Sequence, residues 1–238
     1  MQISDLKAGA RKLIFDNAPK LVFISLLYIV LDTLMSEFHF RLMGFSDYFP
    51  QLIERLSAGE IPNLNLLLSF FNPYGVFFAL LLTLMAQIIR VGYISYCMKM
   101  HRGSGGDYKD LFNGFLHFVK ILLMSVLIYI ITLPLYMLFI IPGLVVSYMF
   151  RQAYYILLDA PEKGLFQCLS ESIALMRGNK LNLFLLDLSF LGWAILNLSI
   201  VLLIPTPFAL PLISIWLTPY MGLAQAAFYD ELIVELLV

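Results

Sequence analysis

The feature that most constrains this 238-residue sequence is a series of long apolar runs with few charged side chains. A helix needs about 20 mostly apolar residues to cross the hydrocarbon core of a bilayer. Of all residues, 61% are apolar and 13% are charged, whereas a typical soluble domain has about 25% charged residues. The sequence therefore predicts an integral membrane protein. Six runs are long enough to span, at about 20–37, 74–97, 117–138, 140–159, 183–204 and 211–232.

The connections between these runs indicate how they pair. Only "FIIPG" separates the third and fourth runs, and its Pro142-Gly143 is typical of a turn. The fifth and sixth runs are separated by "PTPFALP", whose three prolines prevent a continuous helix. We therefore predict an all-α bundle of six transmembrane helices arranged as three hairpins, in one integral membrane domain over residues 1–238.

The distribution of basic residues predicts the orientation. Six spans place both termini on the same side of the membrane, and cytoplasmic loops carry the excess of lysine and arginine. With the N-terminus inside, only Arg41 and Arg55 face outward, and Arg90 and Arg151 fall within spans. We therefore expect both termini to be cytoplasmic. The other eleven of the fifteen basic residues would then face the cytoplasm: Lys7, Arg11, Lys12, Lys20, Lys99, Arg102, Lys109, Lys120, Lys163, Arg177 and Lys180.

One external connection, residues 38–73, is long. Within it, "DYFPQLIERLSAG" predicts a short helix ending at Gly59, and "NLNLLLSFFNPYG" is an apolar stretch before Pro73. Two interpretations stay open. The segment is either an external lid or partner surface, or it packs over the bundle at the membrane interface.

Three segments on the cytoplasmic side are predicted to be amphipathic helices, at 165–177, near the N-terminus, and less clearly at 107–120. Such helices lie in the membrane interface with their basic residues near the headgroups, or they pack on the cytoplasmic ends of the spans. The sequence is compatible with both arrangements. The apolar sides of the first two are formed by Leu165, Phe166, Leu169, Ile173 and Met176, and by Ile3, Leu6, Ala10, Leu13 and Ile14.

Charged residues inside the predicted spans are the candidate site. Arg90 and Arg151 each begin an Arg-x-x-Tyr pattern that ends at Tyr93 and Tyr154, at a similar depth in their spans. Asp187 lies somewhat shallower in the fifth span, and an arginine side chain is long enough to cover the difference. A charge in the middle of a membrane helix is costly and usually has a partner. We predict that Asp187 meets Arg151 or Arg90, with the two tyrosines nearby. The cluster either fixes the register of the helices or forms a pocket, open to the cytoplasm, for an anionic headgroup or a solute.

Other chemistry is sparse. Asp32 lies deeper, in the outer half of the first span, and is the best candidate for a proton or cation site. His39, His101 and His117 are scattered along the chain and do not predict a metal site. No metalloprotease, hydrolase or dithiol motif is present, so we expect no enzyme activity and no cofactor. No basic block indicates nucleic-acid binding.

The C-terminal half carries several specific motifs, including "MRGNK" followed by "LSFLGW". With these motifs the chain resembles domain-of-unknown-function family 975, a group of uncharacterised bacterial integral membrane proteins. The resemblance implies a bacterial plasma-membrane protein without an established activity, and it supplies no catalytic residues. The matching positions are Ile141-Pro142-Gly143, Leu158, Asp159, Pro161, 172–180, 188–193, Pro219, Tyr220, Ala227, Phe228 and Tyr229.

Two function hypotheses follow. In the first, the protein binds or moves lipid or amphiphile headgroups, anionic ones in particular, at the inner leaflet, so that membrane lipids are its partners. In the second, it is a scaffold or regulatory partner of another membrane protein. An intramembrane enzyme is disfavoured because no nucleophile–base pair is recognisable in the sequence.

Overall fold

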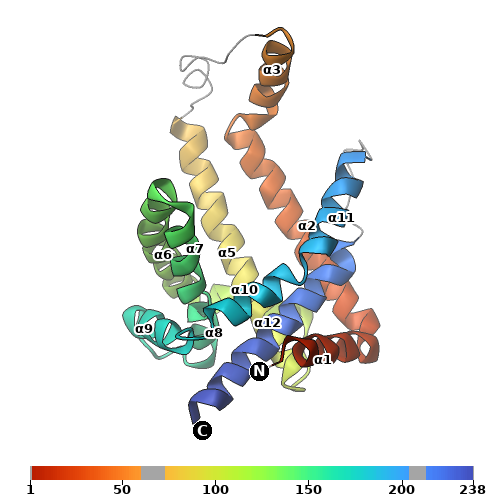
Figure 1. Ribbon diagram of the computed structural model, residues 1–238, viewed down its shortest axis with the longest axis vertical. Coiled ribbons are helices and arrows are strands. Elements are labelled where there is room, and N and C mark those ends of the chain that lie inside the picture. The colour runs from red at the N-terminus through yellow and green to blue at the C-terminus, as the bar shows by residue number, and fades with distance from the viewer. Residues whose placement is uncertain (1, 60–72, 204–212, 238) are drawn as a thin grey trace. The chain divides into compact units, whose positions relative to one another are not determined.

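The computed structural model describes residues 2–59, 73–203 and 213–237, and all the regular structure in these ranges is helical (Figure 1). The chain divides into two units, residues 1–29 with 88–238, and residues 30–87. The predicted all-α class is therefore confirmed. The helices are α1 (Ile3–Asp16), α2 (Ala18–Leu42), α3 (Phe45–Ser57), α5 (Pro73–His101), η1 (Tyr108–His117), α6 (Phe118–Leu138), α7 (Ile140–Met149), α8 (Ala153–Asp159), α9 (Leu165–Leu175), α10 (Lys180–Leu188), α11 (Leu191–Leu203) and α12 (Ser214–Leu237).

Four segments in the described part of the chain are long and apolar enough to cross a membrane. They correspond to the first, second, third and fifth of the predicted spans, and they indicate a membrane protein. The segments are Ala18–Leu42, Pro73–His101, Tyr108–Leu138 and Lys180–Asn197.

The fourth predicted span, 140–159, is divided into two helices. α7 has ten residues, or about 15 Å of helix, and α8 has seven. Neither is long enough alone for a hydrocarbon core about 30 Å thick. The sixth, 211–232, corresponds largely to α12, whose Gln225, Asp230 and Glu231 lower its hydropathy. The six spans and three hairpins thus stay a prediction.

The turn between α6 and α7 lies three residues before the predicted Pro142-Gly143. The extended residue is Phe139, and Pro142 lies in the first turn of α7, where a helix does not need its missing N–H. Gly143 is required for another reason. A Cβ atom there would lie 2.6 Å from the ring of Tyr136 on α6, so the glycine allows the two helices to approach closely.

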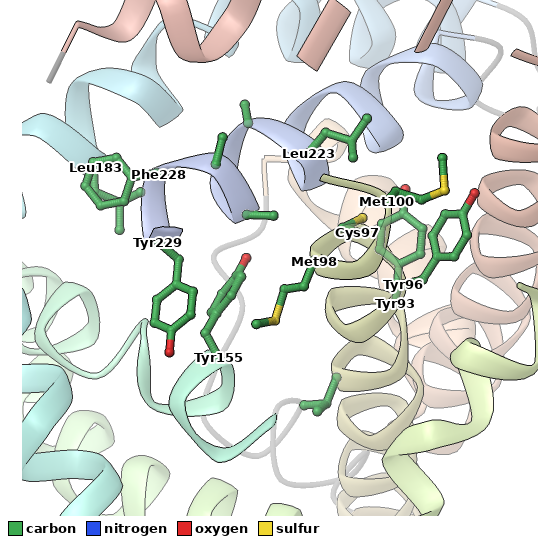
Figure 2. Packing of buried hydrophobic residues seen from close by; sticks show 14 of the residues in the cluster. Tyr93, Tyr96, Cys97, Met98, Met100, Tyr155, Leu183, Leu223, Phe228 and Tyr229 are labelled. Atoms are coloured by element: carbon green, nitrogen blue, oxygen red, sulfur yellow. The ribbon is translucent and has the colours of Figure 1, made fainter. Parts of the chain in front are cut away.

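α12 forms the centre of the first unit. Its buried residues recur at helical spacing, and α1 packs along it with Leu6, Ala10 and Ile14 buried (Figure 1). Burying a leucine or isoleucine stabilises such a contact by roughly 1.5–3 kcal/mol relative to exposure to water. Figure 2 shows a second contact of α12, in which the rings of Tyr229 and of Tyr155 on α8 lie 5.1 Å apart. For α1, packing on a neighbouring helix is therefore the arrangement observed.

The second unit, residues 30–87, holds the rest of α2, all of α3 and the beginning of α5. Within it, His39 Nδ1 lies 3.2 Å from Thr83 Oγ1 and 3.3 Å from the carbonyl oxygen of Ala79, and so joins α2 to α5. α3 ends at Ser57, and Gly59 has a φ of +77°, which agrees with the short helix predicted to end there. The apolar stretch predicted before Pro73 lies largely outside the described residues.

Candidate functional site

Asp187, in the last turn of α10, is the centre of a polar cluster built from three helices and a turn. Its Oδ2 lies 3.5 Å from Arg151 Nη2 and accepts a 2.9 Å hydrogen bond from Tyr148 Oη on α7. Its Oδ1 accepts a 3.0 Å bond from Gln225 Nε2 on α12. The carboxylate side chain is 18% exposed, so its charge is largely shielded from solvent and is compensated from several sides.

Two helix interruptions position this cluster. Arg151 lies in the turn at residues 150–152 between α7 and α8, and Asp187 lies next to the turn at 189–190 between α10 and α11. A carbonyl freed by an interruption needs another donor. Ser172 Oγ of α9 donates to the carbonyl of Met149 at 2.7 Å, and Lys7 Nζ of α1 donates to the carbonyl of Ser189 at 3.4 Å.

Three of the predicted members lie elsewhere. Arg90 is exposed on α5, and no contact between it and Asp187 is present. Tyr93 Oη is 2.9 Å from Ser25 Oγ, and Tyr154 Oη is 2.8 Å from Ser125 Oγ. Tyr148 and Gln225, which the sequence interpretation missed, hold the carboxylate instead. Nothing in a single sequence distinguishes these two residues from other polar residues in apolar helices.

Asp32, the candidate proton or cation site, is exposed on α2 in the second unit. His39 belongs to the same unit, whereas His101 and His117 belong to the first. Over the described ranges, no three His, Cys, Asp or Glu side chains gather closely enough to hold a metal ion.

Arg102, directly after α5, forms a second polar centre. Its Nη1 and Nη2 donate to Asp159 at 2.6 and 2.8 Å, and its Nη2 and Nε donate to Asp230 at 2.6 and 3.1 Å. Asp159 ends α8 and Asp230 lies in α12, so one guanidinium joins the ends of three helices. The two carboxylates stabilise the positive charge of Arg102 and so raise its pKa. We call this group the Arg102 clamp.

A cleft of about 600 Å³ opens beside the Arg102 clamp, between the first turns of α1, the end of α5 and the last turns of α12. Its walls combine apolar and ionisable side chains. His101 Nε2 lies 3.6 Å from Asp230 in this wall. The lining residues are Gln2, Asp5, Leu6, Gly9, His101, Ala227, Asp230, Glu231, Val234 and Glu235.

Glu231 is one of four carboxyl groups among the described residues of the cleft wall. Burial raises its pKa above the ordinary value of a glutamate; the nearby carboxylates of Glu235 and Asp5 also raise it, whereas the N-terminal ammonium group and His101 act in the opposite direction without cancelling the rise. Burial and the carboxylates both disfavour the negative charge of Glu231. The attraction of a positive charge in the cleft would offset both effects.

Comparison with known proteins agrees with the motifs of the sequence. Residues 131–235 match the model of the family described as "Protein of unknown function (DUF975)". The resemblance predicted from the motifs is thereby confirmed. No curated protein and no solved structure matches the chain.

The DUF975 region contributes most of the polar groups described above. It runs from α6 to α12 and includes Asp159, Asp187 and Asp230, the carboxylates of both polar centres. Arg151 lies within the DUF975 region, and Arg102 precedes it. The clamp therefore links the DUF975 region to the end of α5.

Proposed function

We propose that this protein binds the amine-bearing headgroup of an amphiphile at the cytoplasmic end of its helices, without covalent catalysis. The observation that carries the proposal is the cleft between α1, α5 and α12, about 600 Å³ in volume, with apolar and ionisable side chains in its walls. Small-molecule sites are usually concave and largely apolar, with a few polar groups that orient the ligand.

The composition of the walls favours an amphiphile. Leu6, Ala227 and Val234 offer apolar surface to an alkyl chain. Asp5 and Glu231 offer carboxyl groups to a headgroup in the same cleft. A ligand that satisfies both kinds of wall has an apolar part and a polar part.

The charges of the cleft favour an amine. The sequence favoured an anionic headgroup because Arg90 and Arg151 lie within predicted spans. Arg151 contacts Asp187 and is not part of the cleft wall, in which carboxylates predominate. An anion there would be repelled by Asp5 and Glu231, whereas an ammonium group would stabilise the carboxylate of Glu231.

Placement at the inner leaflet follows from the excess of basic residues on the predicted cytoplasmic side. We expect a cysteine introduced at Ser57 to react with an impermeant reagent added to intact cells, and one at Ser104 to stay unlabelled. The opposite pattern would place the cleft at the outer leaflet. It would leave the amine preference of the cleft untouched.

Lipid retention in native mass spectrometry tests the binding itself. Detergent-purified protein is titrated with phosphatidylethanolamine and, separately, with phosphatidylglycerol carrying the same acyl chains. We expect stronger retention of the amine-bearing lipid. Glu231→Gln should weaken it about tenfold, since one hydrogen bond to a charged group contributes about 1.5–3 kcal/mol.

The matched control is Glu162→Gln, which removes an exposed carboxylate in the α8–α9 loop. It should leave retention unchanged. Equal retention of the two lipids, or equal loss in the two variants, would refute the proposal. Retention of a membrane protein in place of lipid would support the scaffold alternative.

A further inference from the structure

η1 is a ten-residue 3₁₀ helix, and its geometry aligns three phenylalanines. With three residues per turn, side chains three apart in sequence lie above one another. Phe112 and Phe115 in η1 and Phe118, the first residue of α6, are 47%, 43% and 47% exposed, and Lys109 begins the same row. The rings of Phe112 and Phe115 are 6.3 Å apart. We call this row the phenylalanine ridge.

The opposite side of η1 is fixed against α5 by two glycines. A Cβ on Gly92 of α5 would lie 1.9 Å from the carbonyl oxygen of Leu111, and a Cβ on Gly114 would lie 2.2 Å from that of Ile88. The two backbones are therefore in direct contact. Leu111 and Gly114, one turn apart, are both buried there. A rotation of η1 that buried the ridge would break this contact.

A hydrogen-bonded network holds η1 in the same orientation. Asp110, which is buried, accepts 2.6 Å and 2.9 Å bonds at Oδ1 from Lys99 Nζ and Asn113 Nδ2. Its Oδ2 accepts a 2.7 Å bond from the backbone N–H of Asp107. Asn113 also donates to Ser95 Oγ on α5 at 3.3 Å. The acidic group of η1 is thus turned inward, away from the ridge.

The other two amphipathic segments differ from η1 in this respect. α1 buries Leu6, Ala10 and Ile14, and α9 buries Cys168, Leu169 and Ser172 while Phe166 stays exposed. On η1 the aromatic row is left exposed. The three segments that look alike in sequence therefore have different surroundings.

Exposed apolar side chains follow the phenylalanine ridge along α6. Val119, Leu123 and Ile130 of α6 are 52%, 53% and 65% exposed. They belong to the candidate span Tyr108–Leu138, whose mean hydropathy is 2.4. Because this wall of α6 faces lipid if the segment spans, the ridge meets the same bilayer at the headgroup boundary.

We propose that the phenylalanine ridge of η1 inserts into the boundary between headgroups and acyl chains and fixes the depth of this end of the protein in the bilayer. Interfacial helices of this kind place aromatic side chains among the upper acyl chains and lysines among the headgroups. Lys109, exposed at the start of the ridge, matches an anionic headgroup.

Single-tryptophan reporters in nanodiscs test this contact. In a full-length chain carrying Trp193→Phe and Trp216→Phe, Phe112→Trp and Phe115→Trp each place one reporter on the ridge. Ser104→Trp, in the exposed loop before η1, is the matched control. We expect lipids brominated near the top of the acyl chain to quench the ridge reporters at least about twofold more than the control. Aqueous acrylamide should quench mainly the control.

A second measurement does not need the tryptophan-free background. Cys97 and Cys168 are buried, so Phe115→Cys and Ser104→Cys can be labelled selectively with a polarity-sensitive dye. The dye at position 115 should emit at shorter wavelength than at position 104. Emission as in water at both positions, or efficient acrylamide quenching on the ridge, would overturn the proposal. Protection from both quenchers would also overturn it, because protein would then cover the ridge.

Discussion

Replacing Arg102 by alanine should destabilise the first unit by uncoupling the ends of three helices. The guanidinium makes short, forked contacts with Asp159 and Asp230, which follow it by 57 and 128 residues. Without it, two carboxylates are left close to one another with the attraction of the shared cation removed. The substitution therefore removes a link between α5, α8 and α12 and leaves Asp159 and Asp230 to repel each other.

The exposure of the three side chains determines the size of the effect. Arg102, Asp159 and Asp230 are 37%, 28% and 23% exposed. Exposed ion pairs contribute about 0.2–1 kcal/mol, and removing one partner of a buried pair costs about 3–5 kcal/mol. We expect about 2–3 kcal/mol for Arg102→Ala, between these limits. In a chain of this length that corresponds to a fall in Tm of about 4–12 °C.

Thermal unfolding in detergent, followed by the fluorescence of Trp193 and Trp216, measures the change. The rings of these tryptophans are 5.6 Å apart and report on packing between α11 and α12. Arg177→Ala, at an exposed position after α9, is the charge-matched control and should shift Tm by at most about 1–2 °C. Arg102→Lys should lose part of the stability, since an ammonium group lacks the planar fork.

The triple variant Arg102→Ala, Asp159→Asn and Asp230→Asn distinguishes a lost tie from stranded charge. Because it removes the carboxylates as well, we expect it to be more stable than Arg102→Ala alone. If Arg102→Ala unfolds at the same temperature as Arg177→Ala, the clamp contributes no stability. If the triple variant loses as much stability as the sum of the losses in the separate variants, repulsion between the two carboxylates is not the cause of the destabilisation by Arg102→Ala.

Three further predictions use the same assay. Asp187→Asn should lower Tm, and adding Arg151→Gln should restore part of the loss, because it removes the positive charge left without its partner. If the effects of the two substitutions on stability are simply additive, Asp187 and Arg151 are not coupled. The raised pKa of Glu231 means that the folded state binds its proton more tightly than the unfolded state, so stability should fall as pH rises from below the ordinary glutamate pKa through the raised value. Glu231→Gln should abolish this pH-dependent component and raise Tm at neutral pH. If the pH profile of the variant equals that of the unmodified protein, the prediction is wrong. Gly92→Ala should destabilise the protein strongly because its Cβ would meet the backbone carbonyl of Leu111. Gly192→Ala, which has no atom within 4 Å of its Cβ, should be neutral or stabilising. Equal effects of the two substitutions would exclude close packing of η1 on α5.

Much of the helical layout could be predicted because length and hydropathy are properties of contiguous residues. The break between the predicted helix at 165–177 and the predicted span from about 183 is an example, since α9 ends at Leu175, α10 begins at Lys180, and Gly178 between them has a φ of +86° that favours glycine. The end of α3 could be predicted in the same way, from Gly59. In both cases the signal lies within a few residues of the feature.

The interruption at residues 150–152 could not be predicted in the same way. It contains Arg151 and Gln152 within an otherwise largely apolar run, and no proline or glycine lies in it to mark the end of a helix. The donor that compensates it, Ser172, is 23 residues from Met149. The Arg102 clamp joins residues that are still farther apart in the sequence. Contacts of this kind follow from tertiary packing, to which local periodicity is insensitive.

The distribution of polar groups supports our proposal that the ligand binds in the cleft and not at the Asp187 cluster. Asp187 has an ion-pair partner and two hydrogen-bond donors within the protein, and Asp159 is held by Arg102. A ligand at either would have to replace contacts that are already satisfied. In the cleft wall, by contrast, burial and like charges disfavour the carboxylate of Glu231, so a cation gains stabilisation without breaking the clamp. In this proposal the internal ion pairs and hydrogen bonds position the helices, and the cleft beside them binds the ligand.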